Sequence, residues 1–197
     1  MKNLYSLPNI LTYLRILVIP AIFWALIQEN ELWSRWISCI LFAFASITDY
    51  FDGYFARHMK ITSKVGKFLD PIADKLLVTV VLITLAQTKF LAWWDLAIAA
   101  AIISREIFVS GLREFMGNFH VEMPVSRLAK WKTASQLFAI GFLIFGRNYK
   151  MRFHNSMYDL FLFDVYVIGV CLLLISAVLT IITGVQYWRA AAQHMTD

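Results

Sequence analysis

The sequence is poor in charge, cysteine, proline and glycine. Only 16% of its 197 residues are charged and 60% are hydrophobic, whereas soluble domains carry about 25% charged residues. The two cysteines, Cys39 and Cys171, are far apart in apolar segments, which favours packing over a disulfide or metal role. Four prolines and eight glycines leave long stretches without helix breakers. These deficits predict an all-α integral membrane protein.

Six apolar segments reach or approach the length of a membrane span, which takes about 20 helical residues. The second is long enough only if its helix continues through Asp52 to about Arg57, and the fifth is short. No repeat, low-complexity tract or soluble domain interrupts the pattern, so we expect a single domain, residues 1–197, with six transmembrane helices. The predicted spans are Ile10–Gln28, Trp33–Ile47, Ile72–Leu91, Trp93–Leu112, Thr133–Phe145 and Phe161–Trp188.

The distribution of basic residues predicts the orientation. If the six spans are drawn, most of the 18 Lys and Arg residues fall on the side of the N-terminus, and the exceptions are Arg35, Lys89, Arg147, Lys150 and Arg152. The positive-inside rule therefore places both termini in the cytoplasm. We expect a multi-pass protein of the bacterial cytoplasmic (inner) membrane with its active site facing the cytoplasm. The net charge of +5 lies in short connectors, which suits anionic substrates and lipid headgroups and not nucleic acid.

Four aspartates lie where the second and third apolar segments meet: Asp49, Asp52, Asp70 and Asp74. Carboxylates beside lipid are costly unless they are paired or bound to cations. Asp49 and Asp52 share one helix face, as do Asp70 and Asp74, and Pro71 is tolerated if it lies in the first turn of its helix. All-carboxylate ligation favours one or two Mg²⁺ or Mn²⁺ ions over zinc or copper. Ion pairs with neighbouring Lys and Arg residues are the alternative interpretation.

Small residues accompany the first aspartate pair. Gly53 and Ala56 fall on the same helix face and let a bulky ligand approach the backbone, while Arg57 can clamp a phosphate. Two metal ions at such a site could polarise a phosphoryl group and stabilise the leaving oxygen in an in-line displacement. The stretch therefore indicates phosphoryl-transfer chemistry.

The spacing Asp49-x-x-Asp52-Gly53-x-x-Ala56-Arg57, eight residues, Gly66-x-x-x-Asp70-x-x-x-Asp74 resembles the signature of the CDP-alcohol phosphotransferases at every defining position. The resemblance implies a six-helix membrane fold, usually a homodimer, in which a CDP-linked alcohol binds over two metal ions. Its phosphatidyl or phosphoalcohol group passes to an acceptor hydroxyl and CMP is released. By this resemblance Asp49, Asp52 and Asp70 hold metal, and Asp74 is both a metal ligand and the catalytic base.

A second, basic cluster follows in the other half of the chain. Arg105 and Arg113 lie late in the fourth apolar segment, and Lys130, Lys132 and Thr133 open the fifth. Cations opposite a metal site suit a phosphorylated acceptor. Positive-inside topology alone is the alternative explanation.

Four stretches, residues 7–15, 69–75, 104–106 and 129–136, resemble the bacterial members of the family that use CDP-diacylglycerol and sn-glycerol 3-phosphate. The resemblance implies these two substrates and places Asn9 and Thr12 in the substrate cavity, although both could simply be helix-start residues. The resulting CDP-diacylglycerol-binding set is Asn9, Thr12, Asp52, Gly53, Ala56, Arg57 and Gly66, and the glycerol-3-phosphate set is Arg105, Arg113, Lys130, Lys132 and Thr133.

Two alternatives to this reaction stay open. A different acceptor, as in cardiolipin synthases, would use the same chemistry. A cation transporter would also need intramembrane carboxylates, but near the bilayer midplane, whereas these cluster at one membrane face. The motif contains no Ser, Cys or His nucleophile, so we expect direct in-line attack by the acceptor.

Overall fold

The computed structural model describes residues 7–28, 32–59, 64–87, 93–119, 121, 126–146 and 157–195. Within these ranges the chain forms six helices and no strand. The predicted all-α architecture with six helices is therefore confirmed. The helices are α1 (Leu7–Ile27), α2 (Leu32–Met59), α3 (Lys64–Gln87), α4 (Trp93–Asn118), α5 (Arg127–Gly146) and α6 (Met157–Met195).

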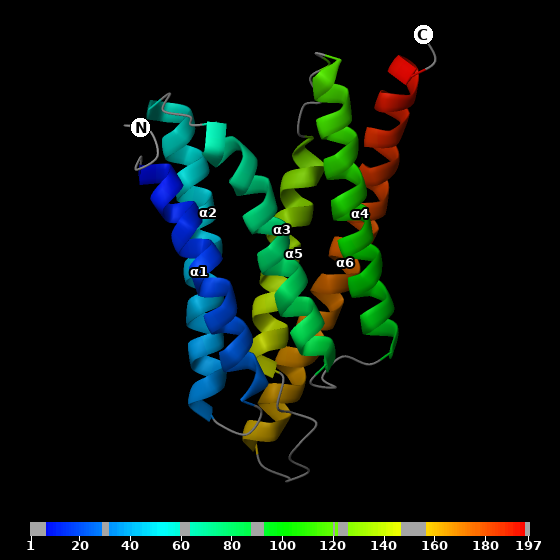
Figure 1. Cartoon of the computed structure of the whole chain (residues 1–197). Helices are drawn as coiled ribbons and strands as arrows, with labels where there is room; N and C mark the ends of the chain where they lie inside the picture. The colour runs from blue at the N-terminus through cyan, green and yellow to red at the C-terminus, as the bar shows by residue number, and fades with distance from the viewer. Residues whose placement is uncertain are drawn as a thin grey trace.

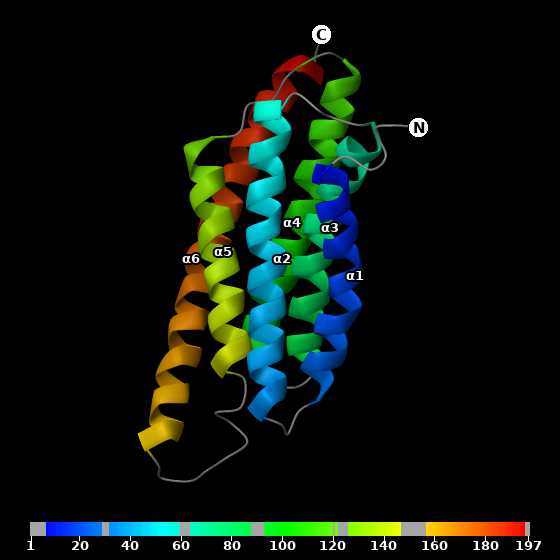
Figure 2. The same ribbon diagram turned by 90° about the vertical axis from the view of Figure 1, so that its left-hand side faces the viewer.

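The helices run up and down one bundle, so that alternate helix ends meet (Figure 1). The starts of α1, α3 and α5 and the ends of α2, α4 and α6 lie at one end, together with both chain termini (Figures 1 and 2). Helix α1 packs against α2 and α3, whereas α6 packs against α4 and α5. Contacts of α2 with α5 and of α3 with α4 join the two groups.

The boundaries confirm one expectation and correct another. Helix α2 continues to Met59, as a full membrane span required. Helix α3 begins at Lys64, so Pro71 is its eighth residue. The condition under which the sequence tolerates Pro71, a place in the first turn, is therefore not met. Proline at this depth lacks the N–H that would bond to the carbonyl four residues earlier. The carbonyl of Pro71 itself accepts a hydrogen bond from Lys75 Nζ at 3.0 Å.

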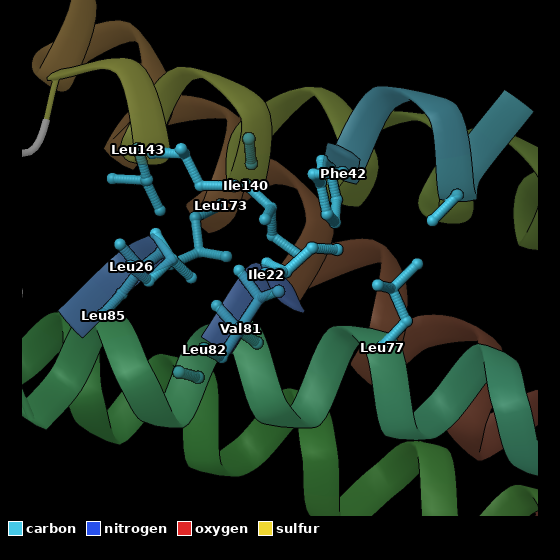
Figure 3. Close-up of a cluster of buried hydrophobic side chains, with 14 of the residues drawn as sticks. Ile22, Leu26, Phe42, Leu77, Val81, Leu82, Leu85, Ile140, Leu143 and Leu173 are labelled. Carbon is cyan, nitrogen blue, oxygen red and sulfur yellow. The ribbon is translucent and has the colours of Figure 1, made fainter. Parts of the chain in front are cut away.

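All six helices contribute residues to the buried core, part of which is drawn in Figure 3. Aliphatic side chains of α3 face those of α1 from one side, and α5 and α6 close the cluster from the other. Burying each such side chain contributes about 1.5–3 kcal/mol in water, but in lipid the contribution comes from packing. The central residues are Ile22, Leu26, Phe42, Val81, Leu82, Leu85, Ile140, Leu143 and Leu173.

Many large apolar side chains are exposed on the outside of the bundle. Leu17 is 71% exposed, Phe138 65% and Ile181 61%, and patches of this kind on a protein surface mark contact with another apolar phase. Among the residues that the structure describes, two helices are long and apolar enough, judged by length and composition, to cross a bilayer. These spans are Asn9–Ile27 in α1 and Val165–Met195 in α6. With 39 residues, α6 is about 58 Å long, so it extends beyond a hydrocarbon core of about 30 Å.

Helices α5 and α6 approach each other closely at Gly146. A Cβ atom on Gly146 would lie 2.8 Å from the backbone nitrogen of Tyr166 and 2.9 Å from its Cα, distances at which the backbone must move. The hydroxyl of Tyr166 donates a 2.7 Å hydrogen bond to Asp95 Oδ2. Gly146 therefore lets α6 sit against α5 while Tyr166 reaches α4.

We expect Gly146→Val to lower the free energy of unfolding by about 1–3 kcal/mol, the usual cost of overpacking. The matched control is Gly141→Ala in the same helix, where an added Cβ would meet nothing within 4 Å. Thermal unfolding of both variants in detergent checks this expectation. Equal unfolding temperatures for Gly146→Val and the wild type would show that the contact is not restrictive.

Candidate active site

Three aspartates and one arginine gather where α1, α2 and α3 meet. Arg15 is 1% exposed, and its Nη1 atom lies 2.8 Å from Asp49 Oδ1 on α2 and also pairs with Asp74 Oδ1 on α3. Arg15 is the only charged residue in α1. A buried guanidinium needs anionic partners, and here it holds the carboxylates of two other helices together.

Helix α1 makes a second contact with α3 one turn earlier. Thr12 is buried and its hydroxyl donates to Asp70 Oδ1 at 2.5 Å, so Thr12 and Arg15 face Asp70 and Asp74 in register. Asn9, another turn towards the helix start, is also buried. The predicted pairing of Asp70 and Asp74 on one face of α3 is present.

The donor chemistry of this cluster fits a hard divalent cation. Asp49, Asp70 and Asp74 supply carboxylate oxygens from two helices, and side chains of this type ligate Mg²⁺ and Mn²⁺. Among the side chains that the structure describes, no three His, Cys, Asp or Glu residues group closely enough to hold a metal ion. The side chains of residues 50–59, including Asp52, Gly53, Ala56 and Arg57, lie outside that description. The roles predicted for them stay predictions.

A basic cluster lies where α4, α5 and α6 meet. Glu106 Oε1 pairs with Lys132 Nζ of α5 and lies 3.2 Å from Arg105 Nη1. Arg105 Nη2 donates to Thr183 Oγ1 of α6 at 2.7 Å. Arg105 and Lys132, two of the five residues predicted to bind the acceptor phosphate, therefore lie beside one carboxylate, and their binding role stays a prediction.

A lysine links the two clusters. Lys75, next to Asp74 on α3, donates from Nζ to Ser110 Oγ on α4 at 2.5 Å. The charges of Asp74, Glu106, Arg113 and Glu114 all act on Lys75. The side chain of Arg113 is exposed, and its predicted role in binding the acceptor phosphate stays a prediction.

The remaining residues predicted to bind substrate differ in how far they are buried. Gly66 is buried at the start of α3. On α5, Lys132 faces the interior and is 5% exposed, whereas Lys130 and Thr133 are exposed, and the Thr133 hydroxyl donates to the carbonyl of Ala129 at 3.1 Å. The binding roles of Lys130 and Thr133 stay predictions.

Sequence reasoning assigned no site role to Arg15, Lys75, Glu106 or Thr183. Arg15 had a detectable signal, because a single arginine in an otherwise apolar helix needs an anion. Glu106 was noted only as the neighbour of Arg105. Thr183 carries no local signal, since Ser and Thr commonly bond to their own helix, as Thr183 also does with Leu179 O at 2.7 Å.

Comparison with known sequences identifies the class of protein. Residues 5–182 match the CDP-alcohol phosphatidyltransferase family, and the chain belongs to this family. The predicted enzyme class and membrane fold are thereby confirmed, because the family consists of membrane-embedded transferases that are generally metal-dependent.

Individual relatives make the comparison more specific. A protein of Rickettsia typhi is 44% identical over 194 residues, which cover 98% of this chain and 99% of the relative. A protein of Rickettsia felis is 43% identical over 189 residues, covering 96% and 97%, and one of Cereibacter sphaeroides is 35% identical over 218 residues, covering 98% of each. All three are named CDP-diacylglycerol–glycerol-3-phosphate 3-phosphatidyltransferase.

Proposed function

We propose that this protein transfers the phosphatidyl group of CDP-diacylglycerol to sn-glycerol 3-phosphate, giving phosphatidylglycerophosphate and CMP. The observation that carries the proposal is that an acidic and a basic cluster lie close together inside one bundle, linked through Lys75. The acidic cluster on α1–α3 suits a metal-bound diphosphate, and the basic cluster on α4–α6 suits a phosphorylated acceptor. The names of the full-length relatives support the same pair of substrates.

Different residues of the chain have different roles in this reaction. Asp49, Asp52, Asp70 and Asp74 would hold two Mg²⁺ or Mn²⁺ ions, which neutralise phosphate charge and stabilise the leaving CMP when bound. Asp74 accepts the proton of the attacking hydroxyl, and the neighbouring Arg15 keeps that carboxylate oriented. Lys132 and Arg105 attract the acceptor phosphate, and Lys75, between the clusters, faces both.

We also propose the cellular setting expected from the sequence: a homodimer in the bacterial cytoplasmic (inner) membrane, with the active-site end facing the cytoplasm. The positive-inside distribution of Lys and Arg supports this orientation. At that face a water-soluble acceptor can meet a lipid donor. Membrane lipid surrounds the apolar outer faces of the helices.

The reaction is tested by CMP release from CDP-diacylglycerol by the purified protein in detergent. We expect CMP release that requires Mg²⁺ or Mn²⁺, is lost in EDTA, and depends on glycerol 3-phosphate far more than on glycerol or phosphatidylglycerol. The position of the basic cluster predicts this preference, because glycerol lacks the phosphate that the cluster would bind. Metal and acceptor are varied independently, and product lipids are identified by mass.

Two results would contradict the proposal. A preference for phosphatidylglycerol would identify a cardiolipin synthase reaction. Metal flux into liposomes without any CMP release would identify a transporter.

A further inference from the structure

One carboxylate sits between the two cations of the basic cluster. Oε1 of Glu106 contacts both Lys132 Nζ and Arg105 Nη1, the latter at 3.2 Å. The side chain of Lys132 is 6% exposed and that of Glu106 is 23% exposed. Removing a lysine from water without an anion beside it is costly, and Glu106 supplies that anion.

Arg105 is held from the opposite side by α6. Its Nη2 atom donates to Thr183 Oγ1 at 2.7 Å, and its guanidinium carbon lies 5.9 Å from the centre of the Tyr187 ring. A Cβ atom on Gly184 would lie 3.3 Å from both Cγ and Nε of Arg105, which is closer than most side-chain contacts. Arg105 therefore lies flat against α6 with little room to move.

The net charge of Arg105, Lys132 and Glu106 explains why the Glu106 carboxylate does not prevent this pocket from attracting an anion. Arg105 and Lys132 carry two positive charges and Glu106 one negative charge, so the trio remains net positive. Without Glu106 the two cations would repel each other, and Lys132 would turn towards water. The carboxylate thus keeps two positive groups close together, an arrangement that the oxygens of one phosphate can contact at the same time.

We propose that Glu106 is a positioning residue for the acceptor phosphate: it fixes Lys132 and Arg105 in a preformed pair, and Thr183 holds the far side of Arg105. This inference rests on the proposed function for the identity of the acceptor. Glu106 does not itself bind the phosphate, because both are anions. The competing idea is that the Glu106 carboxylate blocks the two cations and that the acceptor phosphate must displace it. This idea predicts that removing the charge of Glu106 raises the affinity for the acceptor.

The test is Glu106→Gln, which keeps the shape and removes the charge. We expect the KM for glycerol 3-phosphate to rise about tenfold or more, the equivalent of one charge-assisted hydrogen bond, while the KM for CDP-diacylglycerol stays unchanged. Glu106→Asp should recover part of the affinity. The matched control is Asp95→Asn, which removes the charge of a carboxylate at the other end of the same helix and should leave both KM values of the folded protein unchanged.

A fall in acceptor KM, or no change, in a folded Glu106→Gln variant would overturn the inference. If that variant does not fold, Thr183→Val tests the same arrangement, because it removes only the hydroxyl that holds Arg105. Its acceptor KM should rise about threefold or more, within the range for the loss of one hydrogen bond. An unchanged acceptor KM in folded Thr183→Val would then count against the inference.

The proposed function can fail separately from this inference. If the wild type releases no CMP with glycerol 3-phosphate, the proposed reaction is wrong. The phosphate pocket is then tested by the rise in unfolding temperature that inorganic phosphate produces. The inference requires a rise for the wild type and Asp95→Asn, each relative to the same protein without phosphate, and a smaller rise for Glu106→Gln. Equal rises in all three proteins would refute it.

Discussion

Replacing Asp74 with asparagine is expected to abolish CMP release while largely sparing CDP-diacylglycerol binding. Asp74 is the proposed base, and removing such a group typically costs a factor of about 10²–10⁴ in rate. Its carboxylate also faces Arg15, so the amide loses an ion pair as well as a proton acceptor. The measurement is the initial rate of CMP release at saturating acceptor, combined with stabilisation of the protein by CDP-diacylglycerol.

A second aspartate provides the control for this substitution. Asp95 is buried at the start of α4 and accepts a 2.7 Å hydrogen bond from the Tyr166 hydroxyl, at the end of the bundle away from the site. Asp95→Asn should lower the unfolding temperature but leave the turnover of the folded protein near that of the wild type. Normal turnover in Asp74→Asn would remove Asp74 from the role of base.

Replacing Arg15 with methionine is expected to be among the most destabilising changes in the bundle when no metal ion is present. Breaking a buried ion pair by removing one partner costs about 3–5 kcal/mol. The side chains of Asp49 and Asp74 are 38% and 46% exposed, which places the expected cost near 3 kcal/mol or below. For a chain of this length the unfolding temperature should fall by roughly 6–12 °C.

Divalent cations distinguish this effect from a general loss of packing. In Arg15→Met, Mg²⁺ should restore part of the lost stability, because it supplies positive charge to the same carboxylates. Thermal unfolding is measured in EDTA and in Mg²⁺, with Arg15→Lys as the charge-retaining control. An Arg15→Met protein that unfolds at the wild-type temperature in EDTA would show that the pairing has no structural role.

Much of the fold follows from hydropathy and helix length. The requirement for about 20 residues per span correctly predicted that α2 would continue beyond Asp52, because its apolar part alone was too short. The same reasoning made α5 too short, since α5 begins at Arg127 and includes a polar turn that hydropathy does not assign to a membrane span. Length and composition locate the helices, whereas their ends depend on local contacts.

The site was predictable only where its residues lie close together in the sequence. The spacing of the aspartates on α2 and α3 indicated the acidic cluster, but nothing in that spacing showed that α1 would pack beside both helices and bring Arg15 between them. On α5, Lys130 and Lys132 were grouped as phosphate ligands. Two residues apart on a helix differ by about 200°, so only Lys132 faces the interior. The contacts between a helix and its neighbours therefore determine which of its side chains face the site.

The position of Arg15 near the start of the chain affects how the site is made. A chain is synthesised from its N-terminus, so Arg15 has already left the ribosome when Asp49 follows and when Asp74 follows 59 residues later. Each carboxylate that enters the bilayer region can therefore meet its counter-charge before α4, α5 and α6 exist. The acidic part of the site can be inserted and held without metal or substrate, whereas the basic part must wait for the last helix.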